Sequence, residues 1–336
     1  MTVDWIALEA SDDIDAPSTF LRSTGGNAAN VAHGLARLGI DVRLAAKVGN
    51  DMHGRYLKNR LQNAGVDLDY VVTGSEPTAQ CYVLTDAIGE NLFTNWPRPN
   101  ASHLYDIDDF DPGMFEDANL LHATGISLTM EPRRSAVVEI VDRALAHGLI
   151  VSFDAGFPTG EAALAHSAAR GIMQKCHIVK VNWPELLYWL DCDQADQMSE
   201  PDLERARKLG PLLKQKLLCP VLIVTLSRLG SLVYIDEMSD DGKAAKEIFA
   251  EPYQIECIAG VGAGDAYTAW MLAELNTTLA CSANKADEKA LNYLLQADWQ
   301  TIATRANKAG ALATRTVSAC DGQARADFKT GKYFID

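Results

Sequence analysis

Long apolar segments and metal-binding patterns are absent from this sequence of 336 residues. It has no run of 18 apolar residues, and its first twenty residues include no basic side chain with which a signal peptide could begin. The 7 cysteines are scattered and never spaced as Cys-x-x-Cys, and the 7 histidines show no His-Glu-x-x-His pattern. These absences argue against a membrane protein, a disulfide-bonded secreted protein and a zinc enzyme. We therefore expect a cytoplasmic protein with reduced cysteines.

Positive charge is also scarce. The chain has 30 Lys and Arg against 45 Asp and Glu, which gives a formal net charge of −15. Nucleic-acid binding requires clustered basic residues, so this balance argues against it. Any anionic ligand must instead be held by local N–H groups and dipoles, because the field of the whole protein repels it.

What the sequence does contain is a regular alternation of strand and helix patterns. We expect strands at 3–8, 42–48, 118–123, 149–153, 176–181 and 221–225, and helices at 56–63, 131–147, 162–174, 202–216 and 291–312. Such alternation is typical of a mostly parallel sheet covered by helices. The sequence predicts an α/β fold, a three-layer α/β/α sandwich, formed as one domain by residues 1–336.

The alternation is interrupted between positions 71 and 96. Residues 79–85 and 91–94 have strand patterns on either side of a turn at 87–90, which predicts a β-hairpin. With the segment before Gly25, this hairpin predicts a small β lid formed by residues 5–24 and 77–98. The Asp, Gly and Lys residues of 239–246 predict an exposed loop.

The most informative stretch is Gly262-Ala263-Gly264-Asp265, which begins an apolar helical pattern. Glycines let N–H groups approach a ligand, and a helix N-terminus favours a phosphate or an oxyanion. A carboxylate at that position can accept the proton of an alcohol during phosphoryl transfer. Asp265 could also be a plain N-cap. A Walker A loop would need Gly-Lys-Ser/Thr, and a dinucleotide fingerprint normally lies in the first βαβ unit, so neither fits.

Two further motifs precede this one: Gly25 and Gly26 with Asn30, and Asn182-x-x-Glu185. Each has a structural alternative, a helix start in the first case and a capping box in the second. Their order together with the late glycine loop resembles the PfkB, or ribokinase-like, carbohydrate kinase family along nearly the whole chain. The resemblance implies an ATP-dependent kinase that phosphorylates a hydroxyl group of a small sugar.

The resemblance also implies roles for individual residues. Asp265 matches the general base, and the three residues before it match the anion hole for the transferred phosphoryl group. Asp4, Gly25, Gly26 and Asn30 match sugar-binding positions. The expected ATP-binding residues are Asn182, Glu185, Thr225, Gly230 and Asn307, with Glu185 holding Mg²⁺ through water.

This sequence departs from the family at several points. Ala259 and Gly260 stand where members commonly carry the Asp-Thr pair of a monovalent-cation site, so the resemblance gives no support for potassium activation. The family begins with a full central strand ending near a substrate-binding Asp; Asp4 is the best match, and we expect that strand to be shortened. A nucleoside kinase similar to adenosine kinase and a catalytically weak sugar- or nucleotide-binding protein remain alternatives. Lids in this family sometimes pair, so a homodimer through the lid is a further expectation.

Overall fold

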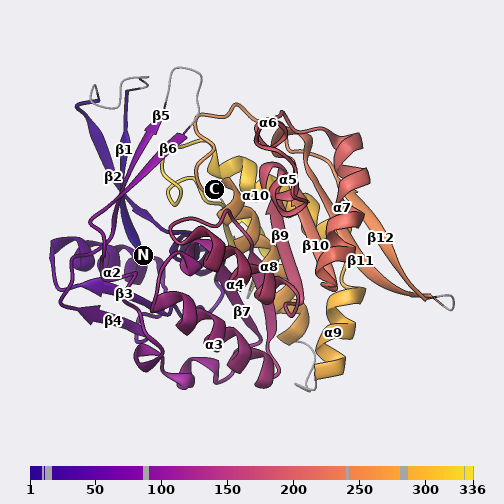
Figure 1. Ribbon diagram of the computed structural model, residues 1–336, viewed down its shortest axis with the longest axis horizontal. Helices are drawn as coiled ribbons and strands as arrows, with labels where there is room; N and C mark the ends of the chain where they lie inside the picture. The colour runs from indigo at the N-terminus through magenta and orange to yellow at the C-terminus, as the bar shows by residue number, and fades with distance from the viewer. Residues whose placement is uncertain are drawn as a thin grey trace. The chain divides into compact units, whose positions relative to one another are not determined.

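The computed structural model describes residues 1–9, 11, 17–85, 91–239, 242–280, 287–328 and 330–335 (Figure 1). It divides into two compact units. Unit 1 consists of Met1–Asp111, Ile255–Trp270 and Ala309–Asp336, and unit 2 of Pro112–Gln254 and Met271–Lys308. The boundary between them falls inside two helices, α8 (Ala263–Ala280) and α10 (Trp299–Ala313).

Unit 1 contains a four-stranded sheet in the order β2-β1-β5-β6. Its strands are β1 (Thr2–Ala7), β2 (Phe20–Gly25), β5 (Gln80–Thr85) and β6 (Asn91–Trp96). β1 pairs antiparallel with β2 and parallel with β5, and β5 pairs antiparallel with β6. The predicted hairpin is confirmed, although its turn at 87–90 lies outside the described residues. The segments predicted as a lid contribute to this sheet, and its action as a lid stays a prediction.

The register of this sheet places Asp4 and Ile6 of β1 beside Cys81 and Val83 of β5. Because side chains alternate between faces along a strand, these four share one face. Ile6, Cys81 and Val83 form a buried cluster against which Val261, from the glycine loop, packs. The sequence therefore fixes Asp4 on the same face as the loop that precedes Asp265.

Besides the beginning of α8 and the end of α10, unit 1 contains two further helices and two small sheets. The helices are α1 (Asn27–Arg37) and α2 (Met52–Ala64); the small sheets are parallel β3 (Ala46–Gly49) with β4 (Val71–Gly74), and antiparallel β13 (Arg325–Asp327) with β14 (Lys332–Ile335). α2 is capped by the Asp51 carboxylate, which accepts from the N–H groups of His53 and Gly54. The Trp270 ring stacks on Phe334 with centroids 4.2 Å apart, so the C-terminal hairpin is packed against α8.

Unit 2 contains a six-stranded sheet in the order β12-β11-β10-β9-β8-β7. Its strands are β7 (Leu120–Thr124), β8 (Ile150–Asp154), β9 (Ile178–Asn182), β10 (Val221–Thr225), β11 (Ser231–Ser239) and β12 (Gly242–Ala250). β7 to β10 are parallel, and β8, β9 and β10 are almost continuously buried, as expected for strands covered on both faces. The helices of this unit are α3 (Arg133–Ala146), α4 (Ala162–Met173), α5 (Trp183–Trp189), α6 (Gln194–Gln197), α7 (Leu203–Leu217), α9 (Asp287–Gln296) and part of α8 and α10.

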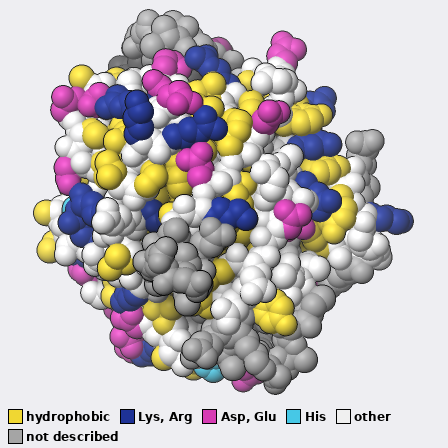
Figure 2. Space-filling view, turned by 90° about the vertical axis from the view of Figure 1, so that its right-hand side faces the viewer, with side chains coloured by type: hydrophobic (Ala, Val, Ile, Leu, Met, Phe, Trp, Pro, Cys, Tyr) yellow, Lys and Arg dark blue, Asp and Glu magenta, His cyan; other side chains and the backbone are white. Residues whose placement is uncertain are grey.

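The prediction of an exposed loop at 239–246 is wrong. Residues from Gly242 onward form β12, which pairs with β11 from Ser239↔Gly242 to Ser231↔Ala250. β12 is an edge strand, and exposed Lys and Glu side chains are a usual protection of such edges. Figure 2 shows the molecule from the side where β12 lies, with basic and acidic side chains intermingled. Charge and glycine content indicated a loop, but they are equally compatible with a solvent-facing hairpin.

The other predicted strands and helices are present, with boundaries shifted by a few residues. The pattern at 291–312 is divided between α9 and α10, and Asp298 accepts from the N–H of Thr301 where α10 begins. β1, which carries Asp4, belongs to the four-stranded sheet. Among the described residues, no helix combines the length and apolarity needed to cross a membrane.

Candidate active site

Asp265 lies in the first turn of α8 and is 6% exposed. Its Oδ2 accepts a hydrogen bond from Asn30 Nδ2 at 2.8 Å, and its Oδ1 accepts one from Asn27 Nδ2 at 3.3 Å. Both amides come from the first turn of α1, which begins directly after Gly26. Two amide donors thus fix the orientation of the carboxylate, which is a geometric requirement for a general base.

The glycine loop reaches Asp265 through a backbone conformation that requires glycine. Gly262 has φ of +80°, and a Cβ at this position would lie 2.5 Å from Ala319 Cα. Its carbonyl accepts from Ala266 N–H, which opens α8. Gly262, Ala263 and Gly264 are half-buried at the N-terminus of α8, where the Ala263 N–H donates to the Gly260 carbonyl at 3.3 Å. That arrangement suits a phosphoryl group.

Asp4 is buried against Gly25. A Cβ on Gly25 would lie 2.0 Å from the Asp4 carboxylate, so a larger residue at position 25 would have to displace this side chain. Burial raises the pKa of Asp4 to about 7; the N-terminal ammonium opposes this shift, and the negative charge of Asp265 adds to it. The structure therefore brings two carboxylates into one electrostatic neighbourhood, a feature common in catalytic sites.

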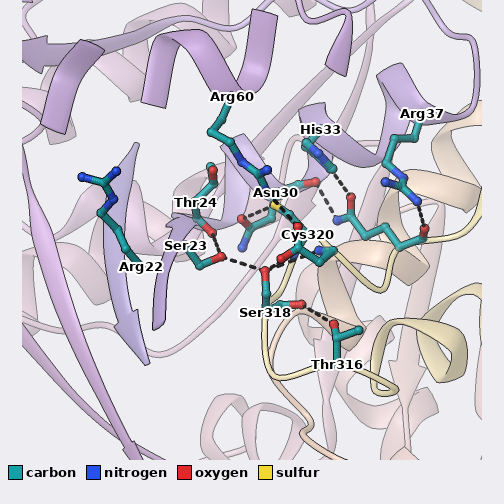
Figure 3. A network of polar contacts seen from close by, with 12 residues as sticks. Arg22, Ser23, Thr24, Asn30, His33, Arg37, Arg60, Thr316, Ser318 and Cys320 are labelled. Atoms are coloured by element: carbon teal, nitrogen blue, oxygen red, sulfur yellow. Dashed lines mark hydrogen bonds and ion pairs between the residues drawn. The ribbon is translucent and has the colours of Figure 1, made fainter. Parts of the chain in front are cut away.

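A network of polar contacts from residues 316–323 supports this arrangement (Figure 3). Cys320 Sγ donates to Asn30 Oδ1 at 3.3 Å, and Gln323 Nε2 donates to the Asn30 carbonyl at 2.9 Å. Gln323 Oε1 in turn lies 2.7 Å from His33 Nδ1. The hydroxyls of Ser318 and Ser23 are 2.7 Å apart and join this segment to β2. Asn30 is thus held from two sides while it orients Asp265.

In unit 2, Asn182 and Glu185 form the capping box of α5. Asn182 Oδ1 accepts from Glu185 N–H, Glu185 Oε2 accepts from Asn182 N–H, and Asn182 Nδ2 donates to Glu185 Oε1, each at 2.9 Å. The structural alternative for this motif is therefore realised. It does not exclude a role in binding, because each carboxylate oxygen keeps a further lone pair.

Glu185 is 7% exposed, and two charged residues of neighbouring strands act on it. Burial raises its pKa to about 7, and the Asp154 charge at the end of β8 raises it further, whereas Lys180 of β9 lowers it. Lys180 Nζ lies 2.6 Å from Asp154 Oδ2. A carboxylate destabilised by burial and by a second carboxylate gains from a nearby divalent cation, so these residues fit Mg²⁺. The described part of the chain offers no group of three His, Cys, Asp or Glu side chains placed to hold a metal ion, and contact through water stays a prediction.

The other predicted nucleotide-binding residues lie around the end of β12. A Cβ on Gly230 would lie 2.2 Å from the Ala250 carbonyl. Asn307 Nδ2 donates to that same carbonyl at 3.0 Å and to the Glu251 carbonyl at 2.9 Å, which leaves Oδ1 as its hydrogen-bonding group for a ligand. Thr225 ends β10, where its hydroxyl lies 3.5 Å from the Val181 carbonyl.

The residues before the glycine loop do not fit a potassium ion. Ala259 and Gly260 have no side-chain oxygen where the resemblance would require Asp and Thr. Instead the Thr314 carbonyl accepts from the N–H groups of Ile258 at 2.8 Å and Ala259 at 3.1 Å. Direct hydrogen bonds thus hold the segment that a cation would otherwise tie together.

Each unit therefore brings part of the predicted set together. Unit 1 gathers the four sugar positions, the glycine loop and Asp265, whereas unit 2 gathers Asn182 with Glu185 and Gly230 with Asn307. Asn27, Cys320, Asp154 and Lys180 were not predicted. Asp154 and Lys180 carried a usable signal, because both are charged residues within apolar strands; nothing local singled out Cys320.

The chain resembles known carbohydrate kinases in sequence and in fold. Residues 1–325 match the sequence profile described as pfkB family carbohydrate kinase. Probable fructokinase-4 of Arabidopsis thaliana is 26% identical over 283 residues, 82% of this chain and 80% of that protein. The crystal structure of fructokinase with bound ATP from Xylella fastidiosa superposes with a TM-score of 0.77 at 24% identity, covering 98% of this chain and 93% of that one. A double mutant of Vibrio cholerae O395 fructokinase, in a form with fructose, ADP and potassium ion bound, gives 0.73 at 24% identity, with 96% and 92% covered.

The structural likeness confirms the predicted fold class, a ribokinase-like α/β architecture around a mostly parallel sheet. Because the family profile spans nearly the whole sequence, the chain belongs to the pfkB family of carbohydrate kinases. It is accordingly an ATP-dependent sugar kinase, as the resemblance predicted.

Proposed function

We propose that this kinase phosphorylates a hydroxyl group of a small sugar, with fructose as the first candidate, and that Asp265 is its general base. Asp265 provides the observation that carries the proposal: a buried carboxylate, held by Asn27 and Asn30, directly follows the glycine loop at the start of α8. The fructokinases among the relatives support fructose as the first sugar to test.

In the proposed reaction, Asp265 accepts the proton of the sugar hydroxyl while the oxygen of that hydroxyl forms a bond to the γ-phosphorus of ATP. The bond from that phosphorus to the bridging oxygen breaks, and ADP leaves. The N–H groups of Gly262, Ala263 and Gly264 stabilise the charge on the transferred group. Asp4 and Asn30, with the turn at Gly25 and Gly26, bind and orient the sugar.

Unit 2 is proposed to bind the nucleotide. Asn307 and the turn from Thr225 to Gly230 would hold the base and ribose, and Asn182 and Glu185 the phosphates. Mg²⁺, held by Glu185 through water, would neutralise phosphate charge. No step in this proposal requires potassium, because Ala259 and Gly260 provide no ligand for it.

We also propose that the four-stranded sheet of unit 1 acts as a lid and can pair with a second copy. Tyr82 and Leu92 are 38% and 53% exposed and share a face of the sheet, and Phe20 lies 5.7 Å from the Tyr82 ring. Exposed apolar faces of this kind often form interfaces. Sedimentation velocity of the unchanged protein and of Leu92→Glu tests the pairing. We expect the unchanged protein to sediment as a dimer and the variant as a monomer; an unchanged protein that sediments as a monomer would contradict the proposal.

The function is tested by measuring ADP release across a panel of sugars and nucleosides. We expect turnover with a ketohexose, and a loss of about 10²–10⁴-fold in kcat for Asp265→Asn, the usual contribution of general base catalysis. Asp202→Asn serves as the matched control, because Asp202 caps α7 and Asn is an equally good cap. Turnover of a ribonucleoside alone would make the protein a nucleoside kinase, and binding of sugar without any ADP release would make it a binding protein.

A further inference from the structure

Unit 1 contains a cavity of about 420 Å³ that is separate from the proposed catalytic residues. It lies where the C-terminal ends of α1 and α10 meet the segment leading into β13. Three of its lining residues are the arginines Arg37, Arg315 and Arg325, and none of these has a part in the proposed reaction. In a protein with a net charge of −15, three arginines around one cavity need an explanation.

The guanidinium groups are incompletely used. Arg37, labelled in Figure 3, donates from Nη2 to the Gln323 carbonyl at 2.8 Å, but its buried Nε has no hydrogen-bond partner within the described residues. Burial lowers the pKa of Arg37, and the positive charge of Arg325 lowers it further, which shows that the two groups repel each other. Arg315 and Arg325 are exposed and form no ion pair in the described part of the chain.

A simpler explanation is that these arginines only balance helix dipoles. Arg37 is in the last turn of α1 and Arg315 follows the end of α10, and basic residues are favourable at both places. Two helix C-termini contribute together about one negative elementary charge. Asp321, which also lines the cavity, contributes one more, but it is paired with Arg60 at 2.7 Å. The three arginines of the lining and Arg60 together carry four positive charges. These exceed the negative charge of the two helix C-termini and Asp321, so the dipoles alone do not account for the arginines.

We infer that this cavity binds a phosphate-bearing small molecule. Guanidinium groups hold phosphate oxygens through paired, charge-assisted hydrogen bonds, and Arg is favoured for this purpose over Lys. The volume lies in the range of small-molecule sites and exceeds what one phosphate group fills. Leu312 and Phe334, also in the lining, add apolar surface for the rest of the ligand. The Thr316 hydroxyl lines the cavity as well but already donates to the Ser318 carbonyl at 3.0 Å, so the arginines provide the donors.

Pyrophosphate is a suitable probe, and its binding is measured by calorimetry at constant ionic strength. We expect saturable binding to the unchanged protein and affinity at least about tenfold lower for Arg315→Gln and for Arg325→Gln, since each substitution removes charge-assisted hydrogen bonds to the phosphate oxygens. Both residues are exposed, so neither substitution should prevent folding, and thermal unfolding verifies this.

Arg143→Gln is the matched control, because Arg143 is an exposed arginine of unit 2 paired with Glu139. It removes the same charge from the protein and should leave the affinity unchanged. Absence of binding, or equal affinity in all four proteins, would overturn the inference; the second result would place pyrophosphate elsewhere, such as at the glycine loop. The measurement needs no turnover, so its outcome is independent of the proposed kinase mechanism.

Discussion

Asp4 couples folding stability to pH in a direction opposite to that of most acidic residues. Its carboxyl is 8% exposed, and burial, supported by the charge of Asp265, raises its pKa from 3.8 to about 7. Between these two values the folded protein binds a proton that the unfolded chain has lost. The stability contributed by this group is therefore present at low pH and is lost as the pH rises towards 7.

The substitution Asp4→Asn removes this penalty while it keeps the shape of the side chain. The displacement of the pKa corresponds to at most about 4 kcal/mol, because each pKa unit is worth 1.36 kcal/mol. Solvent that enters the site will reduce this energy. We therefore expect the difference in free energy of unfolding between Asp4→Asn and the unchanged protein to increase by roughly 2–4 kcal/mol, in favour of the variant, from pH 4 to pH 8. Urea unfolding of both proteins across this pH range measures the difference.

Activity should change in the opposite direction. An ionised Asp4 is the better acceptor for sugar hydroxyls, so kcat/KM of the unchanged protein should rise with pH through about 7. Asp4→Asn should lose about 10–100-fold in kcat/KM and lose this rise. The reasoning would be refuted if the free energy of unfolding of Asp4→Asn depended on pH as strongly as that of the unchanged protein. It would also be refuted if Asp4→Asn retained its full kcat/KM. Asp202→Asn should alter neither quantity.

Three further expectations concern the other parts of the site. Gly262→Ala should lower both kcat and the free energy of unfolding, the latter by about 1–3 kcal/mol, because the position has φ of +80° and contacts Ala319; urea unfolding and ADP release measure the two effects. Glu185→Gln should require several-fold more Mg²⁺ for half-maximal rate. Because the raised pKa of Glu185 costs stability as the pH increases towards 7, the free energy of unfolding of this variant should also depend less on pH. An unchanged magnesium titration would remove Glu185 from the metal site. Potassium, compared with tetramethylammonium at equal ionic strength, should change neither the rate nor the Tm of the unchanged protein. The double substitution Ala259→Asp with Gly260→Thr should create a response to potassium. A tenfold activation of the unchanged protein by potassium would contradict the geometry around the Thr314 carbonyl.

The sequence predicted the parts of this protein that depend on local pattern. Buried strands such as Val221–Thr225 and the capping box at Asn182 follow from apolar runs and from residue spacing, and the structure has them. The strand β12 was missed because Gly and Lys are common in both loops and edge hairpins, and only pairing with β11 distinguishes the two. Strand pairing is a tertiary property, and composition carries little information about it.

The site shows the same division. Asp265 and its glycine loop were evident from a short motif, but their partners were not. Asn27 lies inside the Gly25 to Asn30 motif, but nothing in that motif distinguished it as a partner of Asp265. Cys320 reaches the site from a position whose neighbours in sequence give no sign of it, since its contact with Asn30 spans 290 residues. Lys180 was visible as a charge inside an apolar strand, yet no local pattern identified Asp154 as its partner.

The discontinuity of unit 1 has a consequence for the synthesis of the protein. Asn30 leaves the ribosome 235 residues before Asp265 and 290 residues before Cys320. At about 5–20 residues per second, the N-terminal part spends on the order of 15–60 seconds without the partners that complete its interior. During that interval the strands around Asp4 are exposed to chaperones and proteases, and under the proposed function the nascent chain binds no sugar until its last segment has emerged.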